Sequence, residues 1–108
     1  MTEQGPAWHD CGPVSELNFD PGACVTVGDR EVAVFQFDDG YHAIENSCPH
    51  AGGELADGCL ENGVIACNWH GWRFDVRTGS CVSVPTLSVM THRVRIEDGR
   101  VRVQLSKP

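Results

Sequence analysis

The sequence predicts an all-β fold, an antiparallel β-sandwich or small barrel into which a smaller β-subdomain is inserted at about residues 46–84. Three observations carry this prediction. Apolar and polar residues alternate along residues 31–37 and 101–105, turn-forming residues separate the apolar runs, and no segment repeats its apolar residues with the period of a helix. A chain of 108 residues has the size of one domain, so we expect residues 1–108 to form a single domain.

The first half of the chain is expected to contain three strands. Residues 23–27 form a short strand that ends at Gly28, and residues 31–37 form a longer one that is rich in β-branched and aromatic side chains. A turn reverses the chain into a third strand at residues 41–45. Ahead of these strands, residues 14–17 are predicted to form no more than one short helical turn.

Three further hairpins are expected downstream. An Asn-Gly pair forms the tip of a small hairpin over residues 60–65, and a Thr-Gly pair separates two short strands at residues 73–76 and 81–84. Residues 94–96 and 101–105 alternate on either side of an Asp-Gly turn, which predicts a C-terminal hairpin with one buried face.

Composition and charge exclude several classes of partner. No apolar run approaches the ~20 residues that cross a bilayer, and the N-terminus has neither the basic region nor the apolar core of a secretory signal. We therefore expect a cytoplasmic protein that binds no membrane. The net charge of −7 argues against nucleic acid as a partner. Most acids precede residue 66 and most bases follow it, so either the two halves interleave and mix the charges, or an acidic face steers a basic partner.

Six cysteines occur in the chain, and two of them belong to the motif described below. Disulfides are not expected, because thiols stay reduced in the cytoplasm. The other four lie in or beside apolar stretches and are expected to be small buried side chains: Cys11, Cys24, Cys59 and Cys81. Three histidines lie in or near predicted strands and are expected not to bind metal: His9, His42 and His92.

Two short segments each offer one thiol and one imidazole. The first contains Cys48 and His50, and the second contains Cys67 and His70. Thiolate and imidazole are strong ligands of borderline metals, so these four side chains predict a metal site. A single zinc ion fits less well, because zinc sites usually begin with two cysteines on one segment. One thiolate and one imidazole from each segment instead suit a two-iron centre in which two histidines replace two cysteines on one iron.

The same residues resemble a known family. Cys48-x-His50 and Cys67-x2-His70, with the Gly-Trp-x-Phe-Asp that follows and a later Thr-Gly, are similar to the Rieske-type ferredoxins and to the Rieske domains of ring-hydroxylating oxygenases. The resemblance covers nearly the whole chain and implies one Rieske [2Fe–2S] cluster, held in the inserted subdomain. The thiolates of Cys48 and Cys67 would bind the buried iron. The imidazoles of His50 and His70 would bind the outer iron.

The resemblance also implies roles for the neighbours of the ligands. Backbone N–H groups are expected to donate to the cluster sulfides at positions where a glycine lets the chain come close: Gly52, Gly53 and Gly71. Trp69 and Trp72 are expected to shield the cluster from water. Pro85 matches the proline of the loop that covers the cluster from a third side in this family.

The charge of such a centre predicts its potential. Two ferric ions, two sulfides and two thiolates sum to zero, and centres of this kind span about −150 to +300 mV, against about −400 mV for plant-type ferredoxins. Respiratory members add a disulfide between the ligand segments, and serine and tyrosine hydroxyls near the sulfurs. The corresponding positions here supply neither feature: Gly53, Trp69, Trp72 and Phe74. We therefore expect a potential near about −150 mV, raised by Phe74→Tyr.

By this resemblance the protein is an electron carrier and not an enzyme. It is expected to take electrons from a flavin-dependent reductase and to pass them, through the edge formed by His50 and His70, to a terminal oxygenase. Acidic residues near the first ligand segment are expected either to rim the docking surface or to be ordinary solvated groups: Glu54, Asp57 and Glu61.

Two alternatives stay open at this point. The chain is also similar to the small Rieske-like subunit of assimilatory nitrite reductases, which would bind a large sirohaem subunit tightly. A zinc-binding structural module is the other alternative. A red-brown colour would exclude the zinc module, and co-purification with a sirohaem protein would favour the nitrite reductase subunit.

Overall fold

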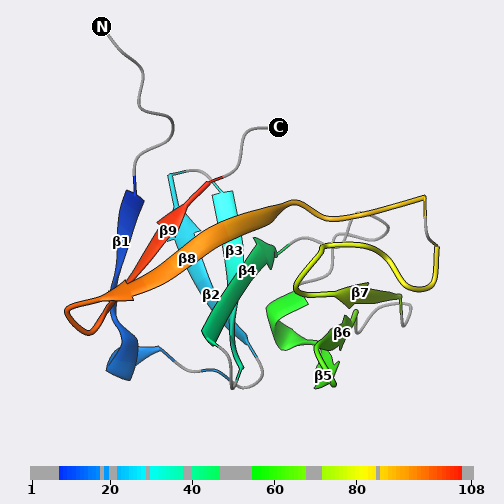
Figure 1. Cartoon of the computed structure of the whole chain (residues 1–108), viewed down its shortest axis with the longest axis horizontal. Coiled ribbons are helices and arrows are strands. Elements are labelled where there is room, and N and C mark those ends of the chain that lie inside the picture. The colour runs from blue at the N-terminus through cyan, green and yellow to red at the C-terminus, as the bar shows by residue number, and fades with distance from the viewer. Residues whose placement is uncertain are drawn as a thin grey trace, which may run out of the picture.

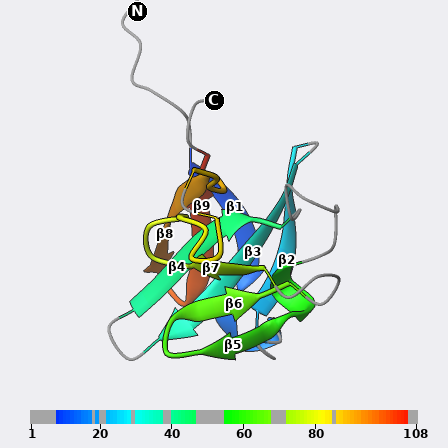
Figure 2. The ribbon, with the colours of Figure 1, turned by 90° about the vertical axis from the view of Figure 1, so that its right-hand side faces the viewer.

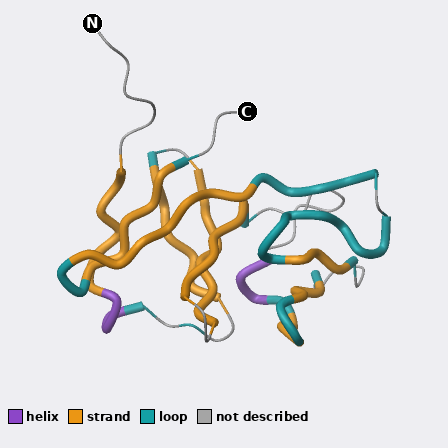
Figure 3. The backbone as a smooth tube through the Cα atoms, viewed as in Figure 1, coloured by secondary structure: helices purple, strands orange, loops and turns teal. Residues whose placement is uncertain are grey.

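The computed structural model describes residues 8–17, 19, 22–28, 30–37, 40–46, 55–67, 72–84 and 86–105. These ranges contain nine strands and two single-turn 3₁₀ helices (Figures 1 and 3). In chain order they are β1 (Trp8–Pro13), η1 (Val14–Glu16), β2 (Gly22–Val27), β3 (Arg30–Phe37), β4 (Gly40–Glu45), η2 (Leu55–Asp57), β5 (Cys59–Glu61), β6 (Val64–Ala66), β7 (Arg73–Asp75), β8 (Thr91–Glu97) and β9 (Arg100–Gln104).

Six strands form one antiparallel sheet in the order β1-β9-β8-β4-β3-β2. The first strand therefore lies beside the last one, and the edge strands β1 and β2 contact each other, so that the sheet nearly closes into a barrel. The predicted all-β class is confirmed. The two halves of the chain also interleave across this sheet: Asp10 of β1 forms an ion pair with Arg100 of β9 at 2.8 Å.

A second antiparallel sheet, in the order β5-β6-β7, is built from the chain between β4 and β8 (Figure 1). The predicted hairpin tip is present between β5 and β6. Asn62 and Gly63 have φ angles of 54° and 81°, the left-handed conformations that a two-residue hairpin turn requires. Figure 2 views the molecule from this side and shows the small sheet in front of the large one.

Two apolar clusters hold the sheets. The first fills the inside of the large sheet: Val25, Val27, Val32, Val34, Ala43, Val101 and Val103. The second includes side chains of both sheets: Ala33, Phe35, Ile44, Leu55, Ala56, Ile65, Cys67, Phe74, Val76, Cys81 and Val89. β3 contributes to both clusters, because residues 32–35 are all completely buried. Successive side chains of β3 therefore point into different apolar clusters. Because Ala33 and Phe35 pack with residues of the small sheet, β3 joins the small sheet to the large one.

The structure departs from the predicted elements in three places. β1 is missing from the predicted set, because its exposed polar residues show no strand alternation. Ile96 is exposed, so the buried face of the C-terminal hairpin comes mainly from Val101 and Val103 of β9. The expected strand at residues 81–84 is reduced to one isolated bridge, in which Cys81 lies opposite Phe74.

Two of the four cysteine predictions are wrong. Cys24 and Cys59 are exposed, because the alternation of β2 and β5 turns them away from the core. Cys11 is partly buried, and Cys81 is buried as expected. All the cysteines in the described ranges are free thiols. The helices in these ranges are single turns, and none is long and apolar enough to cross a membrane.

Candidate metal centre

One of the four predicted ligands falls in the described part of the chain. Cys67 follows β6 directly, and Cys48, His50 and His70 lie outside the described residues. Cys67 is 2% exposed, belongs to the apolar cluster shared by the two sheets, and carries a free thiol. A free thiol enclosed by apolar side chains fits a thiolate ligand, because a bound cation supplies the charge that the surroundings lack.

The second ligand segment begins and ends at neighbouring strands. The Cys67 N–H donates to the Trp72 carbonyl over 2.7 Å. The adjacent residues, Ala66 of β6 and Arg73 of β7, are cross-strand partners. The chain therefore leaves the small sheet and returns to it at paired positions, so the sheet register determines where residues 68–71 begin and end.

The first ligand segment is closed at its ends in a similar way. The Leu55 N–H donates to the Asn46 carbonyl over 2.7 Å, and the Ala56 N–H donates to the Asn46 side-chain Oδ1 over 2.8 Å. Asn46 follows β4, and Leu55 begins η2. Residues 47–54 therefore follow a strand of the large sheet and precede the helical turn η2. The first two residues of η2 are hydrogen-bonded to Asn46, the residue just before this segment.

The two segments are packed together at their bases. Leu55 and Cys67 belong to one buried cluster. Gly58 lies against the Ala66 carbonyl so closely that a Cβ atom at this position would overlap it. The end of the first segment is thus held against the beginning of the second. The described residues at these two ends, 55–58 and 66–67, therefore lie against each other.

A third loop, of which residues 79–84 and 86–89 are described, lies beside β7. The Val82 N–H donates to the Arg73 carbonyl over 2.7 Å, and the Cys81 N–H donates to the Leu87 carbonyl over 3.0 Å. Val82 itself is 55% exposed. Pro85, predicted to cover the cluster, lies outside the described residues.

The aromatic residues after the second segment offer no hydroxyl group. Phe74 is completely buried, paired with Ile65 on one side and bridged to Cys81 on the other. Trp72 is partly buried and packs against the same cluster. The prediction that no hydroxyl at these two positions donates to a cluster sulfur stays a prediction.

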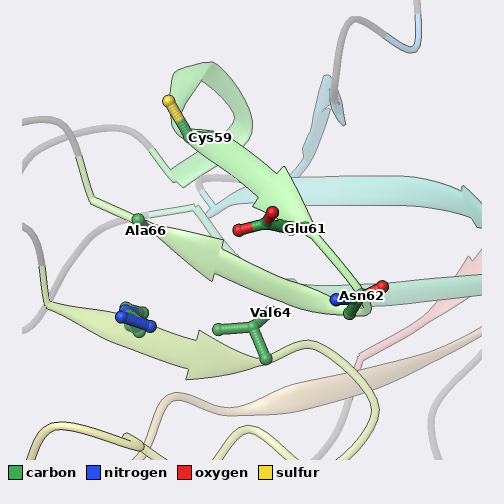
Figure 4. Close-up of a pocket in the computed structure, with 6 residues that line it drawn as sticks. Cys59, Glu61, Asn62, Val64 and Ala66 are labelled. Atoms are coloured by element: carbon green, nitrogen blue, oxygen red, sulfur yellow. The ribbon is translucent and has the colours of Figure 1, made fainter.

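The outer face of the small sheet carries a shallow hollow of about 410 Å³. Figure 4 shows five of its lining residues, with Cys59 and Glu61 on β5, Asn62 at the tip, and Val64 and Ala66 on β6. Arg73 of β7 completes the lining. Of the acidic residues expected to rim a docking surface, Glu61 is exposed here, the side chain of Asp57 is not described, and Glu54 lies outside the described residues.

The histidines that were predicted not to be ligands lie in the large sheet. His92 of β8 has a fully buried side chain, with Nε2 lying 2.6 Å from Oε1 of Glu45. The same carboxylate oxygen pairs with Arg30 at 2.6 Å. The ring of His42 lies 5.4 Å from the ring of Phe37, centroid to centroid. His9 is exposed on β1.

Sequence reasoning missed the importance of Glu45 and Asn46. Both are polar residues at the end of an apolar strand, so hydrophobic periodicity gives them no signal. Asn46 is completely buried, and Glu45 has a partly buried side chain shared by two partners. The available hint was the position of Asn46 between a strand and a ligand segment, where asparagine side chains often hydrogen-bond to the nearby backbone.

The comparisons with known proteins agree with this architecture. The family model described as "Rieske [2Fe-2S] domain" matches residues 7–101. The anthranilate 1,2-dioxygenase ferredoxin subunit of Burkholderia cepacia is 35% identical, over 97% of this chain and 99% of that protein. The ferredoxin component of the naphthalene 1,2-dioxygenase system of Pseudomonas aeruginosa is 36% identical, over 98% of this chain and all of that protein (100%).

Solved structures show the same fold. The ferredoxin of carbazole 1,9a-dioxygenase from Nocardioides aromaticivorans superposes with a TM-score of 0.81 at 28% identity, over 94% of this chain and 99% of that one. A protein assigned as the small subunit of an NADH-dependent nitrite reductase from Mycobacterium tuberculosis superposes with a TM-score of 0.82 at 26% identity, over 95% and 98% of the two chains.

Proposed function

This chain belongs to the Rieske [2Fe–2S] domain family, and on that premise we propose that it is the ferredoxin component of an oxygenase system. It is an electron carrier, not an enzyme, and it takes electrons from a flavin-dependent reductase and passes them to a terminal oxygenase. The observation that carries this conclusion is the full-length match to ferredoxin components: the chain spans 99% and 100% of two such proteins at 35% and 36% identity.

We propose that Cys48, His50, Cys67 and His70 hold the cluster. When bound, a Rieske [2Fe–2S] cluster supplies a one-electron couple. The buried free thiol of Cys67 and the joined bases of the two segments support this ligand set. The absence of hydroxyl groups at Trp72 and Phe74 supports a potential near the low end of the Rieske range, about −150 mV.

The proposal extends to the organisation and location of the chain. Residues 1–108 would be one domain, with the cluster in a subdomain of about residues 46–84; the family match over residues 7–101 and the separate small sheet support this division. A cytoplasmic location is proposed because the described cysteines are free thiols, as expected in a reducing compartment.

The relative from the naphthalene system suggests what the downstream oxygenase would act on. Two of the similar proteins serve dioxygenases of aromatic compounds, anthranilate and naphthalene. A terminal oxygenase for an aromatic substrate is therefore the partner class to test first. A solved complex of reduced oxygenase and oxidised ferredoxin, whose matched chain is 30% identical, supports direct assembly with such a partner.

Two measurements on the purified protein test the function. A visible absorption spectrum and an electron paramagnetic resonance spectrum of the reduced protein should show a histidine-ligated [2Fe–2S] centre. Stopped-flow mixing of the reduced protein with an oxidised Rieske oxygenase should then show electron transfer within the catalytic time of that oxygenase. A colourless protein with one zinc per chain would instead identify a structural zinc module.

A second candidate is the small subunit of a nitrite reductase, favoured by the TM-score of 0.82 with the mycobacterial protein. The two candidates differ in what the chain binds. A nitrite reductase subunit would co-purify with a large sirohaem protein and would not reduce a Rieske oxygenase. A ferredoxin component would purify alone and turn over with both redox partners.

A further inference from the structure

Asn46 is a fully buried polar residue at the point where the chain leaves the large sheet for the first ligand segment. Its backbone is bonded on both sides: its N–H donates to the Glu31 carbonyl over 3.0 Å, and its own carbonyl accepts from the Leu55 N–H over 2.7 Å. Its side-chain Oδ1 accepts from the Ala56 N–H over 2.8 Å. One residue therefore bonds to β3 and to the first two residues of η2.

The other end of the side chain is also engaged. Nδ2 of Asn46 donates to Oε1 of Glu31 over 3.4 Å and to Sγ of Cys24 over 3.5 Å. These contacts are longer than the bond at Oδ1, so the acceptor oxygen makes the stronger interaction. A buried amide is costly unless its polar atoms have partners, and every contact described here joins a different strand or turn to the same side chain.

We propose that Asn46 is a positioning residue for the first half of the cluster site. Residues 47–54 lie between Asn46 and Leu55 in the sequence. Two adjacent hydrogen bonds join Asn46 to Leu55 and to Ala56. One bond would set only the distance between the ends. The second bond, from the side chain to the next residue, also sets the direction in which the chain returns. The inference rests on the proposed ligand set, because Cys48 and His50 lie within this segment.

Glu45, the last residue of β4, has interactions that do not involve Asn46. Its carboxylate pairs with Arg30 of β3 and with His92 of β8, and its N–H donates to the Met90 carbonyl over 2.9 Å. Because β4 is held in this way without Asn46, loss of the Asn46 side chain should leave the sheets in place. The effect should fall on the ligand segment, and so on how firmly Cys48 and His50 are presented to the second segment.

The test compares cluster retention with stability. Asn46→Ala removes both polar atoms of the side chain, and it should accelerate loss of the cluster to an iron chelator by at least ~10-fold, as for other residues that orient metal ligands. The electron paramagnetic resonance signal of the reduced protein should broaden or shift. Val101→Ala is the control, because Val101 is equally buried but lies in the other apolar cluster. Val101→Ala should lower the thermal midpoint of unfolding. At temperatures far below that midpoint, it should retain the cluster as the wild type does.

A second pair of variants decides the matter if Asn46→Ala cannot be purified. Asn46→Asp keeps the acceptor oxygen but replaces the Nδ2 donor by a second oxygen, which faces Glu31 and Cys24, so it should release the cluster faster than the wild type. Asn62→Asp makes the same chemical change at the exposed hairpin tip and should behave as the wild type. Equal retention in Asn46→Asp and Asn62→Asp would overturn the inference, as would equal retention in Asn46→Ala and Val101→Ala.

The ligand set is tested separately. If Cys48→Ala or His50→Ala still binds a full complement of iron and sulfide, the proposed ligands are wrong and the role of Asn46 falls with them. If those variants lose the cluster while the Asn46 variants retain it with an unchanged spectrum, the positioning role alone is refuted.

Discussion

The buried side chain of His92 lies with Nε2 2.6 Å from Oε1 of Glu45. These residues are far apart in sequence and stand on β4 and β8, the strands that lead into and out of the small sheet. The pairing of β4 with β8 is short, with Ala43 opposite His92 and Ile44 opposite Thr91. The side-chain contact therefore closes the base of the whole inserted region, where the backbone ladder is weakest.

Replacing His92 by leucine is expected to lower the free energy of unfolding by about 1–3 kcal/mol, because the partly buried Glu45 carboxylate loses one of its two hydrogen-bond partners. Urea unfolding followed by circular dichroism measures this. His9→Leu is the control, since His9 is exposed on β1 and surface changes of this kind usually stay within ~0.5 kcal/mol. Equal midpoints for the two variants would show that the Glu45–His92 contact contributes nothing.

Phe74→Tyr is expected to raise the reduction potential. Phe74 is completely buried two positions after Trp72, close in sequence to the second ligand segment. A hydroxyl placed there can donate to a cluster sulfur, and such a bond stabilises the reduced state. Protein-film voltammetry gives the midpoint. Phe37→Tyr adds the same hydroxyl on β3, beside His42, and should leave the midpoint unchanged. A drop in the midpoint of Phe74→Tyr would contradict the expectation.

Neighbouring residues form a row across the outer face of the small sheet: Cys59, Ala66, Arg73 and Val82. Cys59 pairs with Ala66, Ala66 pairs with Arg73, and the Val82 N–H donates to the Arg73 carbonyl. In sequence, Cys67 follows Ala66 and Trp72 precedes Arg73, so the row contains the residues next to the described ends of the second ligand segment. Arginine is enriched in protein interfaces, and Val82 adds an exposed apolar side chain beside it.

Val82→Asp is therefore expected to weaken binding of the terminal oxygenase about 10-fold, equivalent to ~1.4 kcal/mol, because the new carboxylate loses its hydration when the interface forms. Ile96→Asp is the matched control, because Ile96 is the other exposed large apolar side chain in the described ranges and lies on β8. Binding by surface plasmon resonance and the rate of oxygenase reduction both report the effect. If both variants bind alike, partners do not dock over Val82.

Asp10 provides a pH-dependent contribution to stability. The hydrogen bond from Arg100, and then that from the Gly12 N–H, lower the pKa of Asp10. A carboxyl group whose pKa is lowered by folding stabilises the folded state above its unfolded pKa of ~3.9, and this contribution disappears as the pH falls through the lower folded pKa.

Asp10→Asn should therefore lower the thermal midpoint at pH 7 and leave it unchanged at a pH below the folded pKa of Asp10. The shift is expected to be small, because the pair is exposed and screened by salt. Glu61→Gln, a neutralised exposed carboxylate on β5, serves as the control. A difference between Asp10→Asn and the wild type that persists at low pH would mean that the substitution acts through packing instead.

Much of the fold and of the cofactor could be predicted from local features of the sequence. The hairpin tip at Asn62 and Gly63 and the strand over β3 depend on conformational preferences of neighbouring residues, so they can be recognised without the rest of the chain. The spacing of Cys48, His50, Cys67 and His70 is equally local, and it led to the family that the comparisons then showed.

Other features could not be predicted, because they depend on which segments the fold brings together. β1 is a strand because β9 pairs with it, and Ile96 of β8 is exposed although its alternation with polar residues predicted a buried side chain. The alternation of apolar and polar residues along β3 did not predict that both of its faces would be buried.

The sequence by itself determined the strands with strong alternation, the tight turns and the kind of metal centre, since each depends on side-chain chemistry within a few residues. The tertiary structure alone decided that Asn46 bonds to Ala56 and Glu45 to His92. Both contacts join residues from different elements, and a buried polar side chain is stable only where folding brings its partners to it. A side-chain contact of this kind closes the ends of the first ligand segment, and a backbone hydrogen bond between Cys67 and Trp72 closes the ends of the second; neither is revealed by spacing in the sequence.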